Sequence, residues 1–204
     1  AVEAARGRVE RAMAALSKKR AVAAPKLATE ISGHLGDLGF VSSRFELALL
    51  PTEEPGPGGG ESLDFLFAPN PGEPPKPLRV IASSGEMSRV MLAVKSALAE
   101  QDSIPLMIFD EIDANVGGEV AHAVGAKMAS LGIRHQVVSI THLPQVAAVA
   151  HCHYVVRKEV VGGKTRSLLQ RVEGEDRVSE VARMLGGGGA PELQLAGTLL
   201  SALT

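Results

Sequence analysis

Two adjacent acids, Asp110 and Glu111, follow an apolar run in the stretch PLMIFDEIDANVGG at residues 105–118. Such a run is typical of a strand buried on both faces of a parallel sheet, and these sheets bind ligands where their strands end. Neighbouring side chains on an extended segment point to opposite sides. One carboxylate can therefore reach a hydrated magnesium ion while the other polarises a water that attacks a γ-phosphate. The alternative is that both acids only cap the following helix.

A phosphate bound at this site needs a glycine-rich loop that opens a helix, with the pattern G-x-x-x-x-G-K-S/T. The stretch VVGGKT supplies Gly163, Lys164 and Thr165, but Lys158 stands where the first glycine belongs. The residues after it resemble a strand, so Gly162 and Gly163 are predicted to form a turn between two strands. The sequence thus contains the acids of a phosphate site without its cradle.

Composition limits the class of protein. The 204 residues are enough for one domain, or for one domain with an appendage, and a hydrophobic content of 45% can form a core. The net charge of −2 gives no global basic field for nucleic acid. A single cysteine, Cys152, excludes an intramolecular disulfide framework. No apolar stretch approaches the ~18 residues of a membrane helix, so a cytoplasmic location is predicted.

The elements that must position the acids are predicted from apolar spacing. The first part of the chain is expected to contain a helix over 2–20, a second helix from Pro25, and two antiparallel strands near 45–49 and 63–67, joined by a flexible loop over 51–61. The expected elements after it are a helix following residue 86, strands at 105–109 and 136–140, a helix over 120–131, a short helix from Pro144, strands near 153–159 and 165–172, and helices near 176–185 and 191–203. Strand and helix in turn predict an α/β fold with a mostly parallel sheet and helices packed on it.

Three motifs occur in an order that resembles one family. ASSGEMSR (82–89), MIFDEID (107–113) and SITHLPQVAA (139–148) are similar to the carboxyl-terminal half of the ATPase head in the RecN family of DNA repair proteins, relatives of SMC and Rad50 within the ABC-type ATPases. In that family the phosphate loop lies in the amino-terminal half, beyond a long antiparallel coiled coil. The resemblance therefore implies a short coiled-coil stub with its helical connection at residues 1–40, and the carboxyl-terminal lobe of the head at residues 41–204.

The resemblance also assigns a binding role to four consecutive residues. Ser83, Ser84, Gly85 and Glu86 match the signature motif, which grips the γ-phosphate of a nucleotide held by a second head. The family has glycine where this chain has Ser84, so the strength of ATP-driven pairing is left open. Without the other motifs, a serine before Gly-Glu at the start of a helix is an ordinary N-terminal cap.

The remaining motif residues take catalytic and metal-binding roles from the same resemblance. Asp110 and Glu111 resemble the Walker B pair, in which the first acid is associated with magnesium and the second is the general base. Asp113 resembles the acid of a loop that crosses between two heads, a loop continued by residues 115–118. His142 resembles the switch histidine that contacts the γ-phosphate.

The function implied by the resemblance is that of an ATPase that uses ATP and Mg²⁺. It would hydrolyse ATP between the paired heads of a homodimer to tether or hold DNA during double-strand break repair and recombination. The implied partners are the amino-terminal half of the same head, the second head, and double-stranded DNA or DNA ends, with a recombinase as a further candidate and no membrane. The implied location is the bacterial cytoplasm, in association with the nucleoid. The isolated chain is expected to be inactive, because it lacks the phosphate-loop lysine.

Two other classes of function remain open at this point. One is the nucleotide-binding subunit of an ABC transporter. The other is a non-catalytic interaction module, in which the acids are structural.

Overall fold

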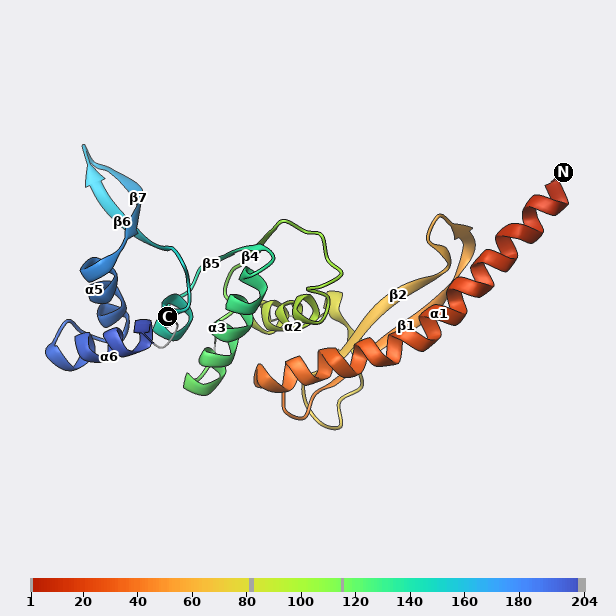
Figure 1. Cartoon of the computed structure of the whole chain (residues 1–204), viewed down its shortest axis with the longest axis horizontal. Helices are drawn as coiled ribbons and strands as arrows, with labels where there is room; N and C mark the ends of the chain where they lie inside the picture. Colours follow the sequence, from red (N-terminus) through yellow and green to blue (C-terminus); the bar gives the residue numbers. More distant parts are fainter. Residues whose placement is uncertain (1, 81–82, 115, 202–204) are drawn as a thin grey trace. The chain divides into compact units, whose positions relative to one another are not determined.

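The structure, a computed structural model, describes residues 2–80, 83–114 and 116–201, and the chain divides into two compact units, Ala1–Asp102 and Ser103–Thr204 (Figure 1). The predicted α/β class is confirmed, since helices pack on three sheets formed by the described residues. Only β4–β5 is parallel, whereas β1–β2–β3 and β6–β7 are antiparallel. The predicted division at residues 40/41 stays a prediction.

Figure 1 labels most of the elements, which follow one another along the chain in a fixed order. They are α1 (Val2–Asp37), β1 (Arg44–Gly56), β2 (Gly59–Ala68), β3 (Lys76–Pro77), the 3₁₀ helix η1 (Leu78–Val80), α2 (Ser84–Ala97), β4 (Leu106–Phe109), α3 (Gly118–Gly132), β5 (Gln136–Ser139), α4 (Pro144–Ala148), β6 (His153–Val161), β7 (Lys164–Val172), α5 (Gly174–Met184) and α6 (Ala190–Ser201).

Helix α1 is continuous over 36 residues, so the predicted break between a helix over 2–20 and another from Pro25 is wrong. Proline lacks an N–H and its ring crowds the carbonyl four residues earlier, which costs about 3 kcal/mol inside a helix. Packing on both sides of Pro25 offsets this cost. Side chains before it contact the β1–β2 hairpin, and Ile31 and Leu35 after it are fully buried.

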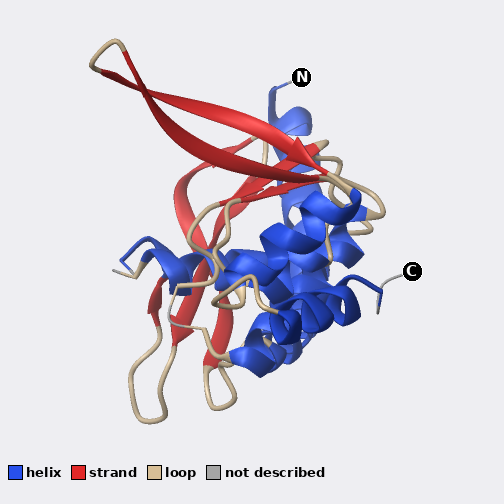
Figure 2. Ribbon diagram, turned by 90° about the vertical axis from the view of Figure 1, so that its left-hand side faces the viewer, coloured by secondary structure: helices blue, strands red, loops and turns tan. Residues whose placement is uncertain are grey.

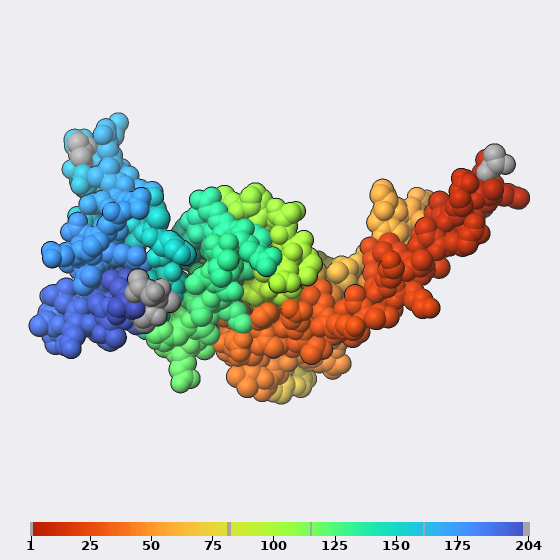
Figure 3. All heavy atoms as spheres, viewed as in Figure 1, coloured from red at the N-terminus to blue at the C-terminus, as the bar shows by residue number. Residues whose placement is uncertain are grey.

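The β1–β2 hairpin is longer than predicted. Residues 51–61, predicted as a flexible loop, mostly continue the two strands, which form one of the twisted pairs drawn in red in Figure 2. Packing against α1 explains the extension. The hairpin lies so close to the helix that a Cβ atom added at Gly60 would lie 2.8 Å from Met13 Cε, and one added at Gly59 would lie 3.0 Å from Leu16 Cδ2. The two glycines let the helix approach the hairpin closely, while the first turns of α1 extend past it (Figure 3).

The core of the first unit lies between α1, α2 and the β1–β2 pair. Phe45 and Phe67 are direct partners in the strand register, and Phe40 packs edge-on against Phe67 with 5.3 Å between ring centroids. The guanidinium of Arg89 in α2 lies 5.1 Å from the centroid of Phe40. Burial lowers the pKa of Arg89 while the Glu86 carboxylate raises it, and the aromatic face offsets part of the lost hydration. This contact ties α2, which begins within the predicted signature motif Ser83–Glu86, to the core.

Strand β4, predicted to be buried on both faces, is buried on one. Met107 and Phe109 are buried, whereas Leu106 and Ile108 are 44% and 65% exposed. The reason is that α3 packs against β5 on one side of the pair, and within the described residues β4 pairs with β5 alone. Val138, the direct partner of Ile108, is also exposed. One face of this small parallel sheet is therefore apolar and uncovered.

The turn predicted at VVGGKT is confirmed. Val161 is the last residue of β6 and pairs with Lys164, the first of β7. Gly162 and Gly163 between them have φ values of 60° and 77°, and two positive φ values are typical of the tight turn that suits twisted hairpins. Two helices, α5 and α6, close the described chain as predicted, and their contact buries Val181, Ala182 and Ala196.

Replacing the proline inside α1 should stabilise the first unit. Pro25→Ala restores one helical hydrogen bond and removes the steric clash, so we expect a gain of about 1–3 kcal/mol in the free energy of unfolding. Urea unfolding followed by circular dichroism measures the gain. Pro71→Ala, in a loop between β2 and β3, is the control and should be neutral or slightly destabilising. A loss of stability in Pro25→Ala would mean that the chain requires a proline kink there.

Candidate functional site

The predicted site residues form two groups, one in each compact unit, and each group is described within its own unit. The first consists of Ser83–Glu86 at the start of α2, and the second of Asp110, Glu111, Asp113 and His142, which follow β4 and β5. Two predicted motif residues, Ala82 and Asn115, lie outside the described residues.

The carboxylate of Asp113 is the centre of the second group. Asp113 is 3% exposed, and its Oδ2 accepts hydrogen bonds from the His142 backbone N (2.8 Å) and the Thr141 hydroxyl (2.5 Å). The same oxygen lies 3.2 Å from His142 Nδ1. Thr141 Oγ1 in turn accepts a hydrogen bond from the backbone N of Leu143 (3.0 Å). Burying a carboxylate is costly without such donors, so these bonds fix the loop after β4 to the loop after β5.

This contact adds a role for Asp113 that the sequence did not suggest. The predicted role, at a crossing between two heads, stays a prediction. The observed role is to hold Thr141 and His142 of its own chain, with the His142 side chain 72% exposed. The sequence held one clue to this contact, which was the position of these residues in the chain. Polar residues that follow adjacent parallel strands meet at one edge of the sheet.

Glu111 has an unusual backbone. Among the described residues it is the only one other than glycine with a positive φ, 55°. The left-handed region costs a side-chain-bearing residue roughly 1–2 kcal/mol, and such residues cluster at functional sites because the surroundings must hold them there. The backbone N of Ala114 donates to the Glu111 carbonyl at 3.1 Å and closes the turn. Both Asp110 and Glu111 are exposed at this turn.

Asp110 can offer a metal ion one carboxylate. Within the described part of the chain, no group of three or more His, Cys, Asp or Glu side chains could hold a metal ion. A magnesium ion is commonly bound by one or two carboxylates together with phosphate oxygens and waters. The position of Asp110 therefore fits a magnesium ion that arrives with a nucleotide.

The serine motif forms a helix N-cap. Ser83 has extended backbone angles (φ −88°, ψ 119°), and its Oγ accepts a hydrogen bond from the Glu86 N at 3.4 Å. This is the geometry of an ordinary helix start. It also suits an anion, because a hydroxyl that accepts one hydrogen bond can still donate its hydrogen, and the first amides of a helix favour negative charge.

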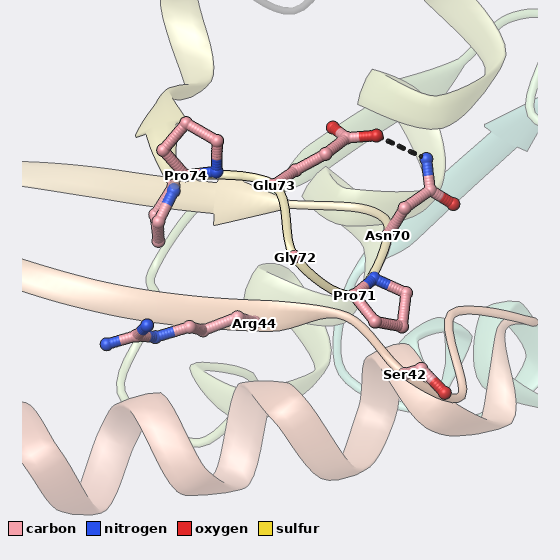
Figure 4. Close-up of a pocket in the computed structure, with 8 residues that line it drawn as sticks. Ser42, Arg44, Asn70, Pro71, Gly72, Glu73 and Pro74 are labelled. Atoms are coloured by element: carbon pink, nitrogen blue, oxygen red, sulfur yellow. Dashed lines mark hydrogen bonds between the residues drawn. The ribbon is translucent and has the colours of Figure 1, made fainter.

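A separate hollow of about 550 Å³ lies in the first unit, between the start of β1 and the loop before β3 (Figure 4). Three prolines shape that loop, and Asn70 Nδ2 donates to Glu73 Oε1 across it at 2.8 Å. Arg44 in its wall pairs with Glu46. None of the predicted site residues lines this hollow, so it is not the candidate site.

Removing the carboxylate of Asp113 should destabilise the second unit. Asp113→Ala leaves the Thr141 hydroxyl and the His142 amide without their acceptor, so we expect a loss of about 2–4 kcal/mol in the free energy of unfolding. Urea unfolding at neutral pH measures it. Asp176→Ala, an exposed acid in the first turn of α5, should lose at most about 1 kcal/mol. Equal losses in the two variants would show that the buried carboxylate is not a structural centre.

Replacing Glu111 by glycine should relieve strain in the backbone and stabilise the second unit. Glycine adopts a positive φ without steric cost, so Glu111→Gly should raise the free energy of unfolding by about 1 kcal/mol. Glu119→Gly, in the first turn of α3, should lower it by roughly 0.5–1 kcal/mol. If both variants lose stability, the turn at Glu111 is not strained.

Comparisons with known proteins place the chain in a family. No protein-family model matches it. The DNA repair protein RecN of Xylella fastidiosa (strain 9a5c) is 46% identical over 174 residues, which cover 84% of this chain and 31% of that protein. RecN of Treponema pallidum is 45% identical over 179 residues (85% and 31%), and RecN of Streptomyces coelicolor is 42% identical over 185 residues (85% and 32%). The chain thus spans about a third of the length of these relatives.

Solved structures agree on the fold. The Smc head domain with a coiled coil and joint from Pyrococcus yayanosii matches with a TM-score of 0.56 and 21% identity, over 77% of this chain and 28% of that one. The Smc head domain with an extended coiled coil from Pyrococcus furiosus, solved with the C-terminal domain of ScpA, matches with a TM-score of 0.52 and 21% identity, over 71% and 34%. The resemblance predicted from the motifs is confirmed: over the segment that it spans, the chain belongs to the RecN family and has the fold of an SMC-type head.

Proposed function

We propose that the chain is the carboxyl-terminal lobe of a RecN-like ATPase head. The complete head would hydrolyse ATP between two paired heads to tether or hold DNA during double-strand break repair and recombination. The observation that carries this proposal is the hydrogen-bonded centre at Asp113, because it joins the loop with the acids to the loop with His142. The 46% identity to a DNA repair protein supports the biological setting.

In this proposal each residue of the second group has one task. Glu111 is the general base that orients and deprotonates the attacking water. His142, exposed and held by Asp113, contacts the γ-phosphate. Asp110 would hold the magnesium ion, which neutralises charge on the phosphate oxygens when ATP is bound.

In this proposal Ser83–Glu86 bind the nucleotide that is held by a second head. Ser83 would donate its hydroxyl hydrogen, while Ser84, Gly85 and Glu86 bring the first turn of α2 against the γ-phosphate. Ser84 carries a side chain where the family has glycine. Its approach to the nucleotide is therefore expected to be less close, which would weaken ATP-driven pairing.

The site also needs the amino-terminal half of the head. The pattern of a phosphate loop is absent from the 204 residues, and the stretch most similar to it is the hairpin turn between β6 and β7. The apolar face of β4–β5, with Leu106, Ile108 and Val138 exposed, is a surface that a further part of the head would cover. Burial of such a face contributes about 25 cal/mol per Å².

The remaining partners follow from this role. They are a second copy of the head, and double-stranded DNA or DNA ends bound by the complete protein, with a recombinase as a further candidate. The bacterial cytoplasm, near the nucleoid, is the proposed location. No described helix has both the length and the apolar character needed to cross a membrane.

Substitution of the general base tests the proposal. In a head reconstituted from this chain and its amino-terminal half, Glu111→Gln should lower kcat for ATP by roughly 10²–10⁴-fold. ATP-induced pairing should be retained, because the amide keeps the size of the side chain. Glu119→Gln, an exposed acid at the start of α3, is the matched control and should keep full turnover. Unchanged turnover in Glu111→Gln would rule out Glu111 as the general base, whereas a parent head that hydrolyses no ATP would favour the non-catalytic module.

A further inference from the structure

Arg177 in α5 anchors the short helix α4. Its Nη2 donates hydrogen bonds to the carbonyls of Ala150 (2.6 Å), Ala148 (3.0 Å) and Ala147 (3.4 Å). The last carbonyls of a helix have no partners within the helix, and a basic side chain can satisfy them. One guanidinium therefore holds the end of α4 and the chain just beyond it.

Helix α4 begins at Pro144, two residues after His142. Leu143 is its N-cap, and the carbonyl of Leu143 accepts hydrogen bonds from Val146 N (3.1 Å) and Ala147 N (3.0 Å). The helix has five residues, far fewer than an isolated helix needs to be stable. Its position therefore depends on the groups that hold it from outside.

Three contacts fix the segment formed by His142 and α4. Asp113 binds the segment at its front, through His142 N. Helix α3 packs on its side, where a Cβ at Gly125 would lie 3.1 Å from the Gln145 carbonyl. Arg177 binds its rear end. The loop that carries His142 is thus fixed at one end by an acid and, through α4, at the other end by a base.

Among the described residues, the carboxylate one turn after Arg177 in α5 is already paired with another base. Glu180, one turn later in α5, pairs with Arg183 at 2.6 Å, and the hydrogen bond from Arg183 is the main reason why the pKa of Glu180 is lowered. In the described part of the chain Arg177 forms no ion pair. It does act on His153, whose pKa is lowered first by burial and then by the charge of Arg177. A cation directed at neutral carbonyls fits a positioning role better than an electrostatic one.

We propose that Arg177 is a positioning residue for His142, so that the α5–α6 pair sets the position of the switch histidine. This inference rests on the proposed function for its catalytic consequence, although not for the anchor itself. Anything that shifts α5 would then change hydrolysis without touching the nucleotide.

The anchor is tested in this chain without nucleotide. Arg177→Met should speed amide hydrogen exchange at residues 143–150 and shift the NMR signals of the His142 ring, whereas Arg177→Lys, which keeps a donor at one point only, should give a smaller change. Arg183→Met, an exposed arginine in the same helix, should leave both readouts unchanged. Unaltered exchange and ring signals in Arg177→Met would overturn the proposal.

The catalytic consequence is tested in the reconstituted head. A displaced catalytic group costs roughly ten- to hundredfold in rate, so Arg177→Met should lower kcat by that factor with a KM for ATP within about threefold of the parent value. Arg177→Lys should recover part of the loss. A parent-like kcat in Arg177→Met, with faster exchange at 143–150, would overturn the positioning role. If the parent head hydrolyses no ATP, the proposed function fails, and the exchange and ring signals still decide whether Arg177 positions His142.

Discussion

The site depends on one buried carboxylate, Asp113, that joins the ends of two parallel strands. The backbone ladder between β4 and β5 is four residues long, and a hydrogen bond from Ile140 N to the Phe109 carbonyl extends it by one step (3.0 Å). Beyond that point the chain leaves the sheet on both strands. The Asp113 side chain then replaces the ladder, with Thr141 and the His142 amide as its donors. The turn with positive φ at Glu111 and the exposed ring of His142 lie on the two loops that this closure joins.

If the site is divided as proposed, the same closure would explain how one half of it is already well formed. The residues that would act on ATP are fixed by contacts within this chain, at Asp113 in front and at Arg177 behind. What the chain lacks is the cradle that would hold the phosphates and the surface that would cover Leu106 and Ile108. In the proposed head, one additional lobe would meet both needs. A preorganised half that binds its substrate only when paired would couple hydrolysis to assembly.

Local patterns predicted most of the elements because apolar residues repeat with the period of each element. They predicted the turn at Gly162 and Gly163 because few other residues tolerate two positive φ values. They failed at Pro25, where packing on the hairpin overrides the usual helix break. They also failed for β4, because the face exposed at Ile108 depends on what lies beside the sheet.

The candidate site shows the same division. Residue types and motif order identified Glu111 and His142 as candidates, and the family resemblance supplied their roles. The order of the strands could place Asp113 and His142, 29 residues apart, at one edge of the sheet. It could not predict their hydrogen bonds, or that Arg177 reaches carbonyls 27–30 residues away. The spacing of residues within one element does not show which residues of distant segments make contact.

The most direct test of a site shared between two halves is calorimetric titration with Mg-ATP. The chain is titrated alone and after mixing with a separately prepared amino-terminal lobe. Binding only in the mixture is the expected result, since the acids would face a phosphate held by the other half. Binding by the isolated chain tighter than roughly 10 μM, about 7 kcal/mol, would contradict a divided site and would mean that this chain contains a phosphate cradle of its own.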